Sequence, residues 1–175
     1  MKLEERGIEI EFTDALDAII FDQMDRNHPN YHGISDMHRV DFVVEFPLDI
    51  VFVELKDPAN PRARPESIAD FHREIQNGTL AHTLAEKFVD TFFYRWAEDK
   101  LSKHVHYLCL VTLEHELLQS LSDDLARRLS PAGKVSSRWQ RHPLRSCHIF
   151  NIQTWNQSFP KWPAKRLSST DSQPH

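Results

Sequence analysis

The sequence has few of the residues that disulfide frameworks, thiolate metal sites and phosphate-binding loops require. Of 175 residues only Cys109 and Cys147 are cysteines, too few and too far apart for a disulfide framework, so we expect reduced thiols. Only four residues are glycine, and the two common glycine-rich nucleotide motifs are absent, which disfavours nucleotide-driven chemistry. The mostly apolar segment 105–111, which includes His106, is far shorter than the roughly twenty residues of a membrane span. We therefore expect a soluble cytoplasmic protein without a membrane partner.

Acidic and basic residues are separated along the chain. Residues 1–124 contain 12 Lys and Arg against 25 Asp and Glu, whereas residues 125–170 contain nine bases and no acid. A basic end on an acidic body predicts a polyanionic partner, and we expect Arg138, Arg141 and Arg145 to contact nucleic acid. The alternative is that the basic end docks on the acidic body of the same chain.

Hydrophobic periodicity and turn residues predict an α/β protein with a mixed sheet flanked by helices, in the order α-β-β-α-β-α-β. We expect one domain over residues 1–166 and a disordered tail at 167–175. The predicted elements are a helix at 13–25, strands at 40–46 and 50–56, a helical region at 67–98 broken near 77–79, a strand at 104–112, a helix at 117–129 and a strand at 147–152.

The two predicted strands around Pro47 contain charged residues where a buried hairpin should be apolar. If the turn is centred between residues 47 and 48, the residue numbers of each cross-strand pair add up to 95, and Asp41 lies opposite Glu54. Alternation places Lys56 on the same face. Opposed carboxylates destabilise a ladder unless a cation bridges them, and oxygen ligands of this kind suit Mg²⁺ or Mn²⁺. The pattern points to metal-assisted phosphodiester hydrolysis.

The segments 39–44 (Arg-Val-Asp-Phe-Val-Val) and 51–56 (Val-Phe-Val-Glu-Leu-Lys) resemble the PD-(D/E)XK nuclease superfamily, also called restriction-endonuclease-like. The resemblance implies a restriction-endonuclease-like core and a Mg²⁺-dependent endonuclease acting on DNA. It also implies that Asp41, Glu54 and the backbone carbonyl of Leu55 bind metal and that Lys56 is the catalytic lysine.

The same resemblance suggests two further site residues and an assembly state. An acid from the first helix often completes the metal site in this family, and Asp17 is the residue chosen here. Some members carry a glutamine on the helix after the lysine, for which Gln76 is the candidate. Small members act as homodimers or as subunits of larger systems.

Other interpretations of these residues remain open. The chain could be a catalytically inactive nuclease-fold subunit that binds nucleic acid or serves as a scaffold. The hairpin acids could be surface residues relieved by a salt bridge to Lys56. A zinc site at His104, His106 and His115 is a further alternative, although the spacing fits no zinc motif. Acyl transfer by a Ser-His-Asp triad is disfavoured because no nucleophile-elbow motif is present.

Overall fold

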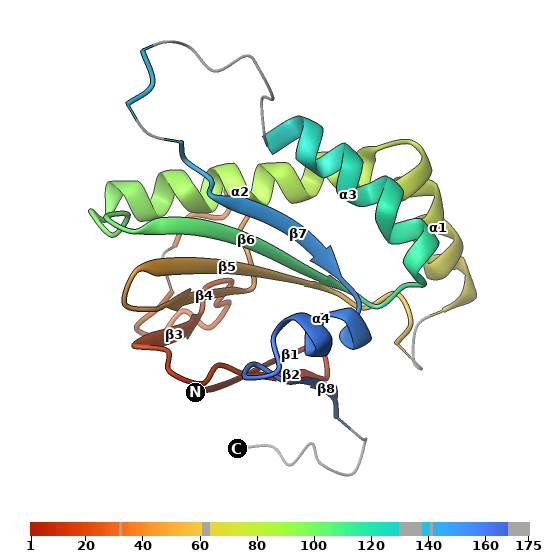
Figure 1. The fold of residues 1–175 in the computed structure, drawn as a ribbon, viewed down its shortest axis with the longest axis horizontal. Helices are drawn as coiled ribbons and strands as arrows, with labels where there is room; N and C mark the ends of the chain where they lie inside the picture. Colours follow the sequence, from red (N-terminus) through yellow and green to blue (C-terminus); the bar gives the residue numbers. More distant parts are fainter. Residues whose placement is uncertain (32, 61–63, 130–137, 141, 168–175) are drawn as a thin grey trace.

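The computed structural model describes residues 1–31, 33–60, 64–129, 138–140 and 142–167, and it has a mixed α/β architecture with two sheets flanked by helices (Figure 1). One sheet has the strand order β3-β4-β5-β6-β7 and the other the order β1-β2-β8. The elements are β1 (Lys2–Glu5), β2 (Ile8–Glu11), β3 (Asp17–Ile20), β4 (Phe42–Glu45), β5 (Asp49–Lys56), α1 (Pro65–Gln76), α2 (Thr79–Ala97), β6 (His104–Val111), α3 (His115–Leu129), β7 (Ser146–Phe150), α4 (Ile152–Ser158) and β8 (Ala164–Arg166).

The larger sheet combines an antiparallel meander with two parallel strands. β3, β4 and β5 pair antiparallel in sequence, β6 lies parallel to β5, and β7 lies parallel to β6. The helices α1 and α2 make the connection from β5 to β6, and α3 makes the connection from β6 to β7, as parallel pairing requires. The run Ile50–Val53 forms the buried middle of the sheet because β-branched and aromatic side chains pack well on both of its faces.

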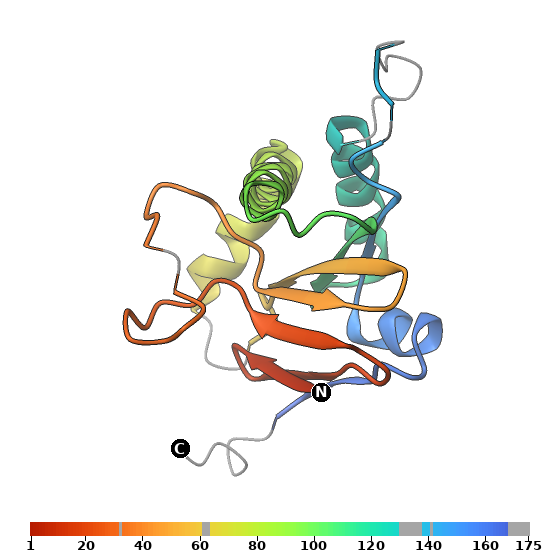
Figure 2. The same ribbon diagram turned by 90° about the vertical axis from the view of Figure 1, so that its left-hand side faces the viewer.

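Each face of this sheet packs into its own hydrophobic core. Figure 2 shows the three long helices on one side, and the small sheet with α4 on the other. Val43 and Phe52 face the helices, in a core that includes Leu84 and Phe88 of α2. Phe42 and Val53 face the small sheet, in a core built around Trp155. The alternation predicted for the hairpin is therefore confirmed.

The predicted helix at 13–25 is wrong, because the chain forms β3 there and pairs with β4. Ile19 packs on the helix side of the sheet and Ile20 on the other, which is the period of a strand. Leu16 would lie on the buried face of the predicted helix, but in the structure it is 58% exposed. Asp14 has a φ of 64°, so the backbone turns immediately before the strand.

The other predicted elements are present within a few residues, and four short elements are additional. The additional ones are β1, β2, α4 and β8, and the predicted helical region 67–98 is two helices, α1 and α2. The predicted order of seven elements is therefore corrected to twelve elements among the described residues. On α2, Leu84 and Phe88 are buried as expected, whereas Phe93 and Trp96 are more than half exposed. At the C-terminus, Leu167 donates its N–H to the Gly7 carbonyl at 2.9 Å, and the rest of the predicted tail lies outside the described residues.

Candidate functional site

The position of Asp41 follows from the register of the β4–β5 hairpin. Phe42 pairs with Val53 and Glu45 with Ile50, so paired positions sum to 95 as predicted, and the next pair outward is Asp41 with Glu54. The backbone at this point is fixed from two sides. Val40 donates its N–H to Thr91 Oγ1 of α2 at 3.1 Å, and the Asp41 carbonyl accepts from the backbone N–H of Phe21 at 2.8 Å.

The Glu54 carboxylate is fully buried and contacts two lysines. Lys56 Nζ lies 2.9 Å from Glu54 Oε1. Lys87 Nζ, from α2, lies 2.7 Å from Oε1 and donates to Oε2 at 2.9 Å. The Lys56 side chain is 16% exposed and the Lys87 side chain 10%, against 0% for Glu54, so both lysines shield this carboxylate from solvent. The sequence prediction that Glu54 and Lys56 share a face is confirmed.

Asp41 is 2% exposed and interacts with the same group of charges. Its Oδ2 accepts the backbone N–H of Leu55 at 2.6 Å. Burial, followed by repulsion from Glu54, raises the pKa of Asp41 from 3.8 to about 7, while Lys87 and the Leu55 N–H act in the opposite direction. The side chain therefore exchanges its proton near neutral pH, which is the property expected of an acid that lacks a full counter-charge.

The arrangement offers two carboxylates to a cation rather than three. Across the described ranges, no group of three or more His, Cys, Asp or Glu side chains is gathered so as to hold a metal. Mg²⁺ commonly uses only one or two protein carboxylates and completes its shell with water and phosphate oxygens. The Leu55 carbonyl fits this set, because the N–H and C=O of one strand residue point to the same edge and the N–H points at Asp41. In this structure the ammonium of Lys87 lies beside Glu54.

Sequence reasoning missed two cations of this site. Lys87 occupies a buried position of α2, in register with Leu84 and Thr91, and a lysine on a core stripe is the signal that could have identified it. Arg6, in the turn between β1 and β2, lowers the pKa of Asp41 through its positive charge. No sequence pattern pointed to Arg6, because the small sheet that places it there was not predicted.

Two predicted site residues lie elsewhere. Asp17 pairs with Glu45 at the other end of β4, about 13 Å of strand away from Asp41, so it cannot complete a metal site there. Gln76 is an exposed residue at the end of α1, and the helix residue that reaches Glu54 is Lys87. The assignment of Asp17 is therefore corrected, whereas that of Gln76 stays a prediction.

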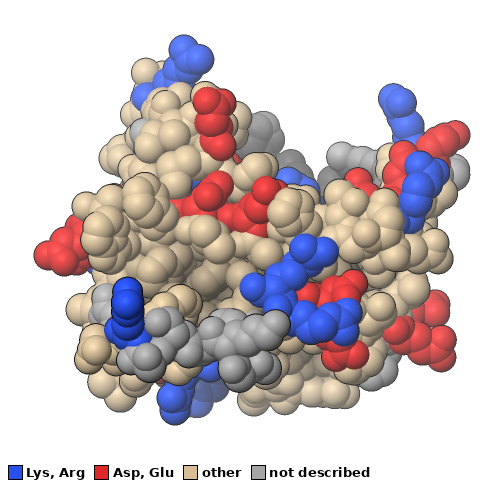
Figure 3. All heavy atoms as spheres, turned by 90° about the horizontal axis from the view of Figure 1, so that it is seen from above, with Lys and Arg blue, Asp and Glu red and all other residues tan. Residues whose placement is uncertain are grey.

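The basic end is engaged in part with the acidic body. Lys161, Lys165 and Arg166 form ion pairs with Asp14, Glu9 and Asp57, and Arg127 pairs with Asp124. Figure 3 shows acids and bases next to one another on the face over the long helices. These contacts support the alternative in which the basic end docks on the same chain.

The three arginines predicted to contact nucleic acid have different outcomes. Arg138 is exposed, and Arg145 lies just before β7. Arg141 lies outside the described residues. Both described residues are exposed, but neither belongs to the cluster around Glu54.

The predicted histidine group is divided between the two ends of β6. His104 and His106 share a face at its start, where Asp49 Oδ1 lies 3.7 Å from His104 Nδ1 and 3.1 Å from His106 Nε2. Nδ1 of His106 is 2.7 Å from Ser146 Oγ. His115 begins α3, beyond the other end of β6. The three histidines therefore do not form one zinc site.

Comparisons with protein-family models, curated proteins and solved structures found no match to this chain. In the part of the chain that the structure describes, no helix combines the length and apolar character needed to cross a bilayer.

Proposed function

We propose that the protein is a divalent-metal-dependent nuclease that hydrolyses phosphodiester bonds, with DNA as its substrate. The observation that carries this proposal is the convergence of Asp41, Glu54 and Lys56 at one end of the β4–β5 hairpin. Two buried acids and a lysine at the rim are the set that metal-assisted hydrolysis of a phosphate ester requires.

The order of elements around the site supports the same proposal. The resemblance to PD-(D/E)XK nucleases implies an α-β-β-β-α-β-like core, with an acid on its second strand and acid-x-Lys on its third. Among the described residues no helix precedes β3, so the first helix of that core has no counterpart in this chain. The strands β3, β4 and β5 form an antiparallel meander, followed by helices and by β6. Asp41 directly precedes the second strand of that meander, and Glu54 and Lys56 end the third.

Each residue then has a defined task. A divalent ion, when bound, would supply Lewis-acid stabilisation of the phosphate. Asp41, Glu54 and the Leu55 carbonyl would hold it, and the Lys56 ammonium would orient the attacking water and offset the charge that builds on the phosphate. Lys87 positions Glu54, and it must yield part of its contact with this carboxylate when an ion binds. Arg6 is placed to attract the phosphate backbone towards Asp41.

A non-catalytic nucleic-acid-binding or scaffold subunit is the second candidate. This candidate is favoured by the contacts of Glu54, because the ammonium groups of two lysines already lie against its carboxylate. In such a protein the four ionic groups would only hold α2 against the hairpin. Added metal would then neither stabilise the protein nor produce cleavage.

Cleavage assays separate these functions. Purified protein is incubated with supercoiled plasmid and with single-stranded DNA, in Mg²⁺, Mn²⁺ or EDTA. The nuclease proposal expects cleavage with metal only, and its loss in Asp41→Asn, Glu54→Gln and Lys56→Met. Asp17→Asn is the matched control, because this exposed acid lies at the other end of the ladder.

Thermal unfolding with and without Mg²⁺ complements the cleavage assay. The proposal expects Mg²⁺ to raise the melting temperature of the wild type and of Asp17→Asn, but not that of Asp41→Asn. If the folded protein shows neither cleavage nor a metal-dependent shift, the nuclease proposal is wrong and the scaffold reading stands.

A further inference from the structure

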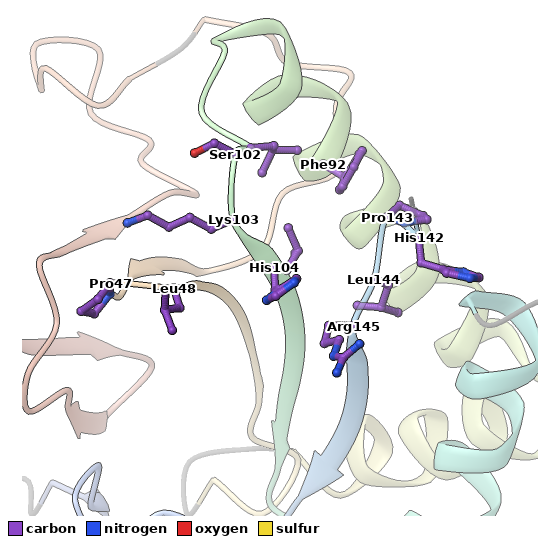
Figure 4. A pocket seen from close by; sticks show the side chains of 12 residues that line it. Pro47, Leu48, Phe92, Ser102, Lys103, His104, His142, Pro143, Leu144 and Arg145 are labelled. Carbon is purple, nitrogen blue, oxygen red and sulfur yellow. The ribbon is translucent and has the colours of Figure 1, made fainter. Parts of the chain in front are cut away.

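A groove of about 490 Å³ opens at the end of the large sheet opposite the acid cluster. β5 extends from Asp49, beside the groove, to Lys56, so roughly 23 Å of strand separates the two places. The walls come from the β4–β5 turn, from residues 101–105 and from residues 142–145, with Phe92 of α2 above (Figure 4). The volume lies within the range typical of small-molecule sites.

The charge of the lining has one sign. None of the twelve residues lining the groove is Asp or Glu, although acids outnumber bases in the whole chain. The ionisable lining residues are Lys103, His104, His142 and Arg145. Lys103 is already paired with Glu45, whereas no ion pair among the described residues involves Arg145. The groove therefore offers to a ligand two imidazoles and a permanently charged guanidinium that has no ion-pair partner in the part of the chain that the structure describes.

The acid nearest to this lining is held by the sheet. Asp49 Oδ1 lies 3.1 Å from His106 Nε2 and 3.7 Å from His104 Nδ1. His106 is itself fixed through Ser146 Oγ. The Asp49 carboxylate therefore lies between these two imidazole rings and is engaged by them. In Figure 4, His104 and Arg145 lie near each other along the groove.

The rest of the lining is apolar. Phe92, Leu48, Pro143 and Leu144 contribute side chains to it. An inorganic ion would leave these surfaces in contact with water, whereas a ligand with an aromatic or aliphatic body would cover them. An arginine with two imidazoles beside it suits a phosphate better than a carboxylate. The guanidinium can bond two phosphate oxygens in a bidentate manner, and phosphate still offers a third oxygen to an imidazole N–H.

We propose that this groove binds a small phosphate monoester with an apolar ring, such as a nucleoside monophosphate, with Arg145 and His104 contacting its phosphate. The site is separate from the acid cluster and does not depend on the nuclease proposal. Adenosine 5′-monophosphate is a suitable probe, and adenosine and inorganic phosphate each carry one half of its chemistry.

The test is calorimetric titration of the full chain in EDTA. We expect saturable binding of adenosine 5′-monophosphate, and binding at least about tenfold weaker for adenosine and for phosphate alone. Arg145→Gln should weaken the nucleotide about tenfold or more, since it removes a charge-assisted contact. Lys161→Gln is the control, because Lys161 is a 79% exposed cation outside the groove. Circular dichroism verifies that each variant is folded.

Three results would overturn the groove proposal. One is the absence of saturable binding at several millimolar nucleotide. Another is equal weakening by Arg145→Gln and Lys161→Gln, which would reveal a general charge effect. The third is loss of nucleotide binding in Asp41→Asn, which would place the nucleotide at the acid cluster. Conversely, unchanged binding by a cleavage-deficient Asp41→Asn would support two separate sites.

Discussion

Replacing Asp41 by Asn should stabilise the metal-free protein at pH 8, although it removes a charged residue from the core. The pKa of Asp41 is raised from 3.8 to about 7 by burial and by Glu54, with the opposing effect of Lys87 already included. The shift of about three pH units corresponds to about 4 kcal/mol between the neutral and the ionised side chain in the folded state. Asparagine retains an oxygen that can accept the Leu55 N–H but never ionises.

The sign of the effect follows from proton binding. Between about pH 4 and pH 7 the folded protein holds a proton on Asp41 that the unfolded chain has released. The free energy of unfolding therefore falls as the pH rises through this window, and it levels off above the folded-state pKa. Asp41→Asn should remove that contribution. The variant and the wild type should have similar stability near pH 4, and the variant should be more stable by up to about 4 kcal/mol at pH 8.

Urea unfolding in EDTA at pH 4.5, 6, 7 and 8 measures this difference directly, because subtracting the two profiles cancels the other titrating groups. Asp17→Asn provides the matched control, since Asp17 is an exposed acid at the other end of β4, and its profile should follow that of the wild type. A difference between Asp41→Asn and the wild type that does not change with pH would refute the reasoning. The reasoning would also be refuted if Asp41→Asn were less stable than the wild type at pH 8.

Two further substitutions test the ion pairs around the site. Lys87→Met should destabilise the metal-free protein by about 3 kcal/mol in urea unfolding, because Lys56 is then the one lysine that still contacts Glu54. Adding Mg²⁺ should raise the free energy of unfolding of this variant by more than it raises that of the wild type. A Mg²⁺ effect no larger in the variant would show that Lys87 and metal do not compete. Arg166→Ala should cost about 3 kcal/mol because Asp57 is 2% exposed, against under about 1 kcal/mol for the neighbouring Lys165→Ala. Equal melting temperatures of the last two variants would contradict this expectation.

The hairpin and its acid pair could be predicted because both depend on local rules. Pro47 within a four-residue connection fixed the centre of the turn, and the turn fixed the register. Once the register was set, the two-residue period of a strand determined which side chains share a face. The opposition of Asp41 and Glu54 therefore needed no knowledge of distant parts of the chain.

The parts that could not be predicted depend on partners far away in sequence. Residues 17–20 form a strand because β4 offers them an edge, although Leu16, Ile19 and Ile20 also fit the spacing of a helix. β8 has only three residues, and it is a strand because it pairs with β2 from the opposite end of the chain. A segment this short has no period to detect. Lys87 reaches Glu54 from a helix 33 residues further along the chain.

The energetics of the acid cluster favour a chemical role over a purely structural one. A buried ionic group of this size gives little net stability, since apolar residues of similar volume are often as stable or more so. Asp41 lacks a full counter-charge, as its raised pKa indicates, whereas Asp57 nearby is fully satisfied by Arg166 and Thr112. The two buried acids therefore differ in kind. Asp57 is paired with the Arg166 guanidinium and connects β8 to the end of β5, whereas Asp41 has no such partner, and the proposed nuclease function would place a divalent ion beside it.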